Sequence, residues 1–404
     1  MKKVDFEFLK RKRFEKDGIE KKVRDIIEKV KKEGDKALFY FTEKFDGVRL
    51  NQLKVKNSEI SSAKKFLSPE ILKIIKETSK RIERYHKKQL PSKFSIKEND
   101  ITLEFLFSPI EKVGIYIPAG QSPLLSTILM TVIPAKIAGV KKIFIASPPS
   151  YDGKVHPLIL ATCNFLGIND IFSIGGAQAI SAFAFGTETV PKVDLIAGPG
   201  NEYVNTAKRL VYGEVGVDLP AGPSEIVIFS DKSGNDKFIE MDLKSQMEHK
   251  GGVGIFITTS ERLGEKISKR IKEGYWILVR NSDEAVEIIN FIKPEHLQII
   301  CRNPEKILNR VIAGAIFVGN YSPATIGDYF AGPSHVLPTG KTAGFSSGLS
   351  VYTFLRSYAV IEAKKEFFDK YGEIIKKFAE IEGLKMHSES ISIRMEKNHL
   401  HKTS

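Results

Sequence analysis

Apolar residues near the N-terminus recur every three or four positions, which is the spacing of an amphipathic helix. Two groups show this spacing most clearly: Ile26, Ile27 and Val30, and later Ile71, Ile74, Ile75 and Ile82. Charged residues fill most positions between them, and we find no strand-like run there. The sequence therefore predicts an α-helical N-terminal segment up to about Ile101.

The pattern changes at Val113 to short β-branched runs, each followed by a Gly or Pro turn and a helical stretch. The runs cover residues 113–117, 142–146, 171–174, 194–196 and 225–229. Alternation of strand and helix is typical of a parallel sheet that is covered by helices. It predicts a first α/β domain.

A second set of such runs follows Asp231. The expected strands are 252–258, 276–279, 297–301 and 316–318, and the expected helices are 237–249, 261–272, 283–291 and 304–311. They predict a second α/β domain. After Gly348 we expect no further strands, but helices at 351–359 and 362–380 and then a polar tail.

A chain of 404 residues, 42% hydrophobic and 27% charged, has the composition of a folded globular protein. Because single cores stop growing at roughly 250 to 300 residues, we expect two main domains. Lys and Arg total 62 against 49 Asp and Glu, a net charge of +13. This surplus could serve nucleic acid or an anionic substrate, but its basic residues are interspersed with acids, as on solvated helix faces.

Cys163 and Cys301 are the two cysteines, too few for a disulfide framework. The N-terminus lacks the apolar core of a signal peptide, and the most apolar stretch, 123–140, contains Ser, Thr, Pro and Lys. We expect a cytoplasmic protein without a membrane span.

Gln246 and His249 in S-Q-M-E-H are three residues apart, so a helix would place both on one face. Further donors occur in distant segments: Asp328 and His335, and Glu382 and His387. Imidazole and carboxylate groups suit zinc. Spacing alone does not show that these donors meet in one site. In the alternative interpretation, Gln246 and His249 are a polar helix end, Asp328 caps a turn and His387 lies in a solvated tail.

Glu295 and His296 follow Pro294 in K-P-E-H-L. Because Pro294 restricts its predecessor, we expect Lys293 to be extended and the loop to present both side chains rigidly. An adjacent carboxylate and imidazole could move protons near neutral pH. The alternative interpretation is the polar start of a strand.

Gly-rich turns follow three expected strands, after Ile117, Ile174 and Ala197. Such turns let phosphates approach backbone N–H groups, which favours a nucleotide, although tight turns also need glycine without a ligand. Ser224 in A-G-P-S-E-I lacks a G-x-S-x-G context, so we interpret it as a hydrogen-bonding contact.

Taken in order, several segments resemble those of the histidinol dehydrogenase family over about residues 15 to 394: VGIYIPAG, GGAQAISAFAFGTE, AGPGNEYVNTAK, DLPAGPSEI, SQMEH, PEHL, GDYFAGPSHVLPTG, FSSGLSV and EGLKMHSESISIR. The resemblance implies two incomplete Rossmann-like, aldehyde dehydrogenase-like domains. It also implies oxidation of L-histidinol through L-histidinaldehyde to L-histidine with two NAD+, in the last steps of histidine biosynthesis. The family's enzymes are homodimers with one zinc ion per subunit.

The resemblance also implies a role for particular residues. The zinc ligands would be Gln246, His249, Asp328 and His387, and the NAD contacts Tyr116, Gln178 and Asn201. The substrate would touch the zinc ligands and also Ser224, His296 and Glu382, with Glu295 and His296 as the acid/base pair. Because the family's C-terminal tail crosses the dimer, Glu382 and His387 would complete the partner's site.

We accordingly divide the chain into four segments. Residues 1–105 would be a helical segment packing on the second α/β domain, 106–229 the NAD-binding domain, 230–345 the domain with the zinc and acid/base residues, and 346–404 a dimer-exchanging helical tail.

Two other interpretations remain. A nucleic-acid-binding protein would account for the positive charge, but would gather it on one surface with aromatic residues. An aldehyde dehydrogenase-like enzyme would use a catalytic cysteine, but Cys163 lies in an expected helix and Cys301 at a strand end.

Overall fold

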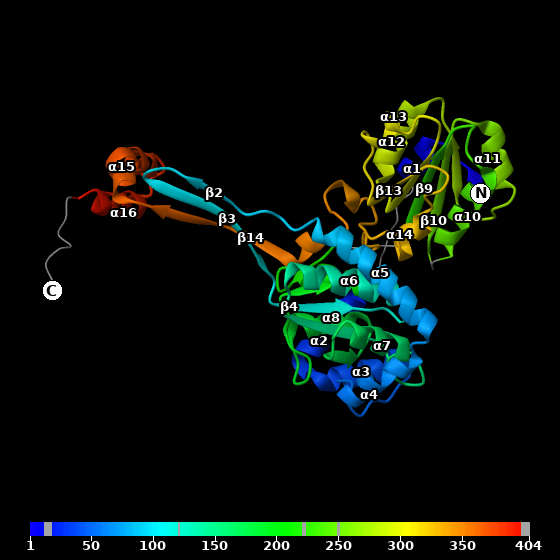
Figure 1. Ribbon diagram of the computed structural model, residues 1–404, viewed down its shortest axis with the longest axis horizontal. Coiled ribbons are helices and arrows are strands. Elements are labelled where there is room, and N and C mark those ends of the chain that lie inside the picture. The colour runs from blue at the N-terminus through cyan, green and yellow to red at the C-terminus, as the bar shows by residue number, and fades with distance from the viewer. Residues whose placement is uncertain (12–17, 120–121, 220–223, 249–250, 397–404) are drawn as a thin grey trace. The chain divides into compact units, whose positions relative to one another are not determined.

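The computed structural model describes residues 1–11, 18–119, 122–219, 224–248 and 251–396 (Figure 1). Its contacts divide the chain into two compact units. The first unit comprises Met1–Leu90 and Ile110–Phe354, and the second comprises Pro91–Pro109 and Leu355–Ser404. Each unit is described by itself below.

One sheet of the first unit has five strands in the order β6-β5-β4-β7-β8, and all neighbours are parallel. The strands are β4 (Lys112–Tyr116), β5 (Lys142–Ser147), β6 (Ile171–Ser173), β7 (Leu195–Ala197) and β8 (Gly216–Val217). The helices between them are α6 (Leu125–Ala138), α7 (Pro157–Phe165), α8 (Gly176–Phe185) and α9 (Glu202–Val211). The strand order reverses between β4 and β7, and ligands of open α/β sheets bind at such a reversal.

The second sheet of this unit has six parallel strands in the order β1-β11-β10-β9-β12-β13. The strands are β1 (Lys2–Lys3), β9 (Glu225–Ser230), β10 (Val253–Thr258), β11 (Tyr275–Leu278), β12 (His296–Ile300) and β13 (Ala315–Val318). Its helices are α1 (Phe6–Arg11), α10 (Asp236–Met247), α11 (Glu261–Ser268), α12 (Ser282–Ile292), α13 (Glu305–Leu308) and α14 (Ala324–Tyr329), followed by the 3-10 turn η2 (Thr342–Gly344). Buried apolar side chains pack on both faces of the sheet, which explains the continuous apolar runs of its strands.

These two sheets confirm the predicted α/β fold. Every expected strand between Val113 and Val318 is present with its ends within two residues, and some helices end a few residues earlier than expected. Figure 1 shows helices beside both sheets. No helix in the described ranges is both long and apolar enough to cross a bilayer.

The N-terminal helices pack differently from expectation. The expected helical segment forms α2 (Ile19–Glu33), α3 (Asp35–Asp46), α4 (Asn57–Ser62), the 3-10 turn η1 (Ala63–Phe66) and α5 (Pro69–Lys87). Residues of α2 and α3, such as Val30 and Leu38, share a core with Phe183 of α8 in the five-stranded lobe. β1 and α1 join the six-stranded lobe, which we expected to receive the whole segment. Our division into four segments otherwise stays a prediction.

The second unit contains strands that the sequence analysis missed. β2 (Phe94–Lys97), β3 (Ile101–Pro109) and β14 (Leu355–Ala363) form an antiparallel sheet in the order β14-β3-β2. The helix expected at 351–359 is wrong, because these residues form the 3-10 turn η3 (Val351–Phe354) and then β14. The helix expected at 362–380 is confirmed as α15 (Lys365–Ile381), and α16 (Lys385–Met395) follows. Pairing with distant β3, not local pattern, decided the conformation of β14.

Candidate active site

Glu295 and His296 lie where β12 begins, beside the start of β9. The N–H of Glu225 donates to Glu295 Oε2 at 3.1 Å, which fixes the carboxylate against β9. Lys293, expected to be extended, instead ends α12 in the left-handed conformation, with φ 48°. Its N–H donates to Ile289 O at 2.7 Å, so the left-handed residue closes the last turn of the helix before Pro294. The expectation of an extended Lys293 was therefore wrong, and the role of the two side chains stays a prediction.

The imidazole of His296 lies between two carboxylates. Its Nδ1 is 3.6 Å from Glu295 Oε2, and its Nε2 is 3.5 Å from Asp328 Oδ1. The ring is nearly parallel to that of Phe317, with 5.9 Å between centroids. The residue is buried, and neither ring nitrogen has a hydrogen-bond partner among the described residues. An imidazole held in this way can exchange a proton with a substrate that reaches it.

Burial and neighbouring charge set the protonation of this cluster. Burial raises the pKa of Glu295 to about 7. Burial lowers the pKa of His296, but the carboxylates of Asp328 and Glu295 outweigh this effect, so its pKa is raised overall. Burial raises the pKa of Asp328, but His296, His335 and Gln246 together lower it more, so Asp328 stays ionised near neutrality. Glu295 is the carboxyl group of this cluster that can gain or lose a proton near pH 7.

Asp328 also contacts two of the residues singled out as metal donors. Its Oδ2 accepts a hydrogen bond from Gln246 Nε2 at 2.8 Å, and its backbone oxygen lies 2.9 Å from His335 Nδ1. His335 Nε2 lies 3.0 Å from Thr127 Oγ1, so both ring nitrogens of His335 are engaged. His335 therefore braces Asp328 and is not placed as a metal ligand.

The predicted zinc ligands are only partly brought together. Gln246 and Asp328 are in contact, His249 lies outside the described residues, and His387 belongs to the second unit. In the described ranges, no group of three or more His, Cys, Asp or Glu side chains is arranged to hold a metal. Carboxylate and amide oxygens with two imidazoles would still suit zinc, and a turned amide of Gln246 would present its oxygen beside Asp328.

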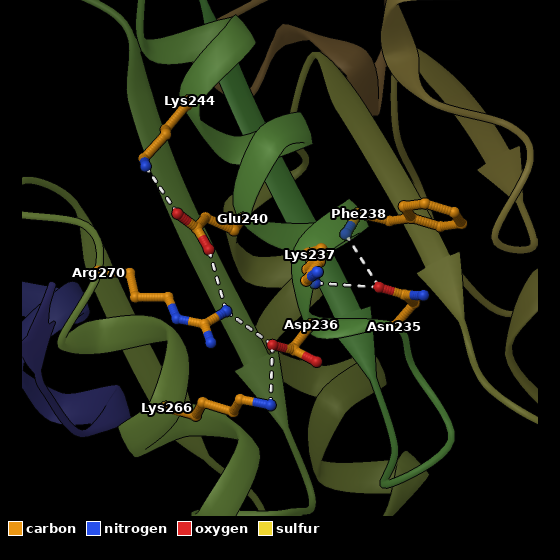
Figure 2. Close-up of polar contacts among 8 residues, drawn as sticks. All are labelled: Asn235, Asp236, Lys237, Phe238, Glu240, Lys244, Lys266 and Arg270. Carbon is orange, nitrogen blue, oxygen red and sulfur yellow. Dashed lines mark hydrogen bonds and ion pairs between the residues drawn. The ribbon is translucent and has the colours of Figure 1, made fainter.

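Helix α10, which carries Gln246 near its end, is anchored along its length. Asn235 caps its first turn by accepting from the N–H groups of Lys237 and Phe238. Gln298 Nε2 of β12 donates to Asp242 Oδ2 at 2.8 Å, a contact that the sequence analysis missed because the two residues are distant in sequence. Figure 2 shows a third anchor, in which Arg270 lies between Asp236 and Glu240. These contacts fix the helix end near Asp328.

The predicted dinucleotide contacts lie along the carboxyl edge of the five-stranded sheet. Tyr116 ends β4, and its hydroxyl oxygen accepts from the N–H of Gly176 at 3.2 Å, at the start of α8. Burial raises the pKa of Tyr116 to about 12, so its hydroxyl keeps its proton. Gln178 is buried in α8 with no partner for its Oε1 among the described residues, and Asn201 caps α9. Tyr116 and Asn201 thus lie at the carboxyl ends of β4 and β7, where the strand order reverses, and Gln178 follows the edge strand β6.

Ser224, Glu382 and His387 complete the predicted set. Ser224 directly precedes β9, and its backbone oxygen accepts from Val253 at 3.0 Å. In the second unit, Glu382 and His387 line a mainly apolar depression of about 640 Å³ between α15 and α16. The roles predicted for Ser224, Glu382 and His387 stay predictions.

The arrangement of two α/β lobes defines a class of dehydrogenase-like folds. An acetylating aldehyde dehydrogenase from Geobacillus thermoglucosidasius is 14% identical and matches with a TM-score of 0.50 over 85% of this chain and 97% of that chain. At this identity, the match shows the fold alone.

The profile of histidinol dehydrogenase matches residues 9–395. Histidinol dehydrogenases from Methanocaldococcus jannaschii and Listeria monocytogenes are 42% and 44% identical, covering 92% and 94% of this chain and 92% and 93% of theirs. The crystal structure of histidinol dehydrogenase from Elizabethkingia anophelis matches with a TM-score of 0.90 at 34% identity, covering 96% of this chain and 95% of that chain. The chain belongs to the histidinol dehydrogenase family, whose members are oxidoreductases of histidine biosynthesis.

Proposed function

We propose that this protein oxidises L-histidinol through L-histidinaldehyde to L-histidine, with two NAD+ as hydride acceptors and zinc as a bound metal. The observation that carries the proposal is the buried cluster of Glu295, His296 and Asp328, with Gln246 beside it. A carboxyl group with a pKa of about 7 beside an imidazole suits a reaction that releases protons in two steps.

In this mechanism, His296 accepts the hydroxyl proton of histidinol while hydride leaves the carbinol carbon for NAD+. Glu295 then accepts a proton from the water that adds to the aldehyde, and the hydrate loses the second hydride. Asp328 stays ionised and stabilises the imidazolium of His296 as it forms. Ser224 and Glu382 would contact the substrate.

Gln246, His249, Asp328 and His387 would hold one zinc ion in each subunit. When bound, the metal would supply Lewis-acid templating, by holding the substrate's imidazole and amino nitrogens in place. Tyr116, Gln178 and Asn201 would contact NAD+. The N-termini of α8 and α9 would face its phosphates.

We further propose a homodimer in which Glu382 and His387 complete the partner's site. The second unit exposes large apolar side chains on its two helices: Ile374, Phe378, Ile381 and Met386 are each more than 60% exposed. Such a surface is typical of an interface. We expect no nucleic-acid or membrane partner, and we expect the enzyme in the cytoplasm, where both thiols stay reduced.

A cysteine-based mechanism is disfavoured by the thiols themselves. Burial raises the pKa of Cys163 to about 12, and burial also raises the pKa of Cys301. A thiol that does not ionise is a poor nucleophile.

The proposed function is tested by following NADH formation from L-histidinol and NAD+, with chelator and then with zinc restored. We expect two NADH for each histidinol consumed, loss of turnover with chelator and recovery with zinc. No turnover with zinc present would contradict the proposal. One NADH for each histidinol would contradict its second step.

A further inference from the structure

Lys208 of α9 and Asp218, just after β8, form an ion pair whose two side chains are both 0% exposed. Removing two charges from water is costly, and an apolar pair of similar size often replaces a buried ion pair without loss of stability. The position of this pair therefore suggests a purpose other than stability.

The ion pair holds one residue, Gly198, of the loop that follows β7, through the two peptide groups on either side of its Cα. Lys208 Nζ donates to Gly198 O at 3.0 Å, and the N–H of Gly198 donates to Asp218 Oδ2 at 2.8 Å. Both backbone polar groups of Gly198 are thus bound by the pair. Asp218 is itself fixed, because its N–H donates to Ile196 O and its Oδ1 accepts from the N–H of Leu219 at 2.7 Å.

Gly198 begins the loop that leads from β7 to Asn201, and it lies beside Tyr116; Asn201 and Tyr116 are both predicted NAD+ contacts. Its φ is +108°, and a Cβ at this position would lie 2.2 Å from the backbone oxygen of Tyr116. The loop from Gly198 to Asn201 is held at its other end by α9. There Asn201 Oδ1 accepts from the N–H groups of Tyr203 and Val204, and Asn205 Nδ2 donates to Gly200 O at 2.9 Å.

We propose that Lys208 and Asp218 are positioning residues for dinucleotide binding. They hold the Gly198–Asn201 loop and the start of α9 in the conformation that receives NAD+, and they touch neither NAD+ nor substrate. This inference rests on the proposed function, because it assumes that Asn201 contacts NAD+. Its reason is geometric: displacement of a binding loop by about 1 Å can weaken function on the order of a hundredfold.

The test is the double substitution Lys208→Met with Asp218→Leu, which removes both charges together and so leaves no unpaired buried charge. We expect the variant to fold, and to bind NAD+ about tenfold or more weakly in calorimetric titration of the zinc-loaded protein. In turnover, KM for NAD+ should rise by a similar factor. The KM for histidinol, and kcat at saturating NAD+, should change by less than about twofold.

Lys192→Met with Glu214→Gln is the matched control, because this exposed ion pair links the residues before β7 to those before β8. Its side chains are 51% and 48% exposed, and we expect its NAD+ affinity to match that of the unsubstituted protein. If the Lys208/Asp218 double variant folds and binds NAD+ with unchanged affinity, the pair is only structural and the inference is wrong.

A second variant covers the case in which the double variant does not fold. Asp218→Asn keeps the side-chain volume and an acceptor oxygen, but it removes the negative charge that pairs with Lys208. We expect this variant to bind NAD+ about threefold to tenfold more weakly. Unchanged NAD+ affinity in this variant would also overturn the inference. Failure of the unsubstituted protein to bind NAD+ or to oxidise histidinol would instead contradict the proposed function.

Discussion

At the scale of single residues, burial decides what the ionisable groups of this protein can do. Glu295 is 7% exposed, and its carboxylate accepts a hydrogen bond from Glu225 N–H, yet burial still raises its pKa to about 7. The half-buried carboxylate of Glu240 has a lowered pKa instead, because of side-chain hydrogen bonds with Lys244 and Arg270. Residue type is visible in the sequence, but this difference is not.

Glu295→Gln should separate the two oxidation steps. The amide has nearly the same shape but cannot accept a proton, so we expect oxidation of histidinaldehyde to slow by about a hundredfold or more, and alcohol oxidation to slow less. Stopped-flow measurement of NADH formation from each substrate checks this expectation. Glu305→Gln, an exposed carboxyl on α13, is the control and should retain both rates. Equal losses in both steps would contradict the role given to Glu295.

The half-buried carboxyl group of Asp46 should make the stability of the protein depend on pH. Burial raises its pKa to about 6 from an ordinary value of 3.8, and its Oδ2 has no hydrogen-bond partner among the described residues. Because the folded-state pKa is the higher one, the contribution of Asp46 to stability is complete below about pH 4 and is lost as the pH rises through 6.

Asp46→Asn should therefore be more stable than the unsubstituted protein at pH 8, by about 1 kcal/mol after solvent screening, and equally stable at pH 4. Urea unfolding at the two pH values measures the difference. Asp25→Asn, on exposed helix surface of α2, should show no such dependence. A stability difference of the same size at both pH values would show that Asp46 acts by packing and not by charge.

At the scale of elements, α10 shows how a short amphipathic helix becomes a fixed support for a site. Its apolar side chains Ile239 and Leu243 are buried against the six-stranded sheet. Its polar face reaches three neighbours, through Asp242 to β12, through Gln246 to α14, and through Asp236 and Glu240 to Arg270, just after α11. The periodicity of the helix was readable in the sequence, but the partners of its polar residues were not.

Arg270→Met should weaken the anchor between α10 and the turn that follows α11, without removing the site. Arg270 Nη1 lies 2.7 Å from Asp236 Oδ2 and 3.1 Å from Glu240 Oε2, and Figure 2 draws both contacts as dashed lines. We expect a small loss of unfolding free energy at low salt, because ion pairs that solvent reaches contribute modestly. The loss should shrink at 1 M salt, where charges are screened. Chemical unfolding with and without salt measures it, and a loss independent of salt would indicate lost packing instead.

At the scale of the whole molecule, the proposed dimer predicts that each active site needs residues from both subunits. If His387 acts in the partner's site, His387→Ala and His296→Asn should each abolish turnover. Refolding the two variants together should restore about a quarter of normal activity. Half of the dimers would then be mixed, and each mixed dimer would have one complete site.

The same mixture distinguishes the alternative arrangement. If His387 served its own subunit, both sites of a mixed dimer would lack one residue and the mixture would stay inactive. Refolding each variant alone is the control, and either variant alone should remain inactive after the same treatment.

The two α/β lobes, the strands from Val113 to Val318 other than the short β8, and the family could all be predicted from the sequence, since they depend on local periodicity, turn residues and ordered motifs. Only the tertiary structure decided that β14 is a strand, because its conformation depends on pairing with distant β3. It also decided that α2 and α3 pack with α8, and that Lys208 meets Asp218. Contacts between residues distant in sequence leave no periodic signal, and the burial that shifts the pKa of Glu295 exists only once those contacts form.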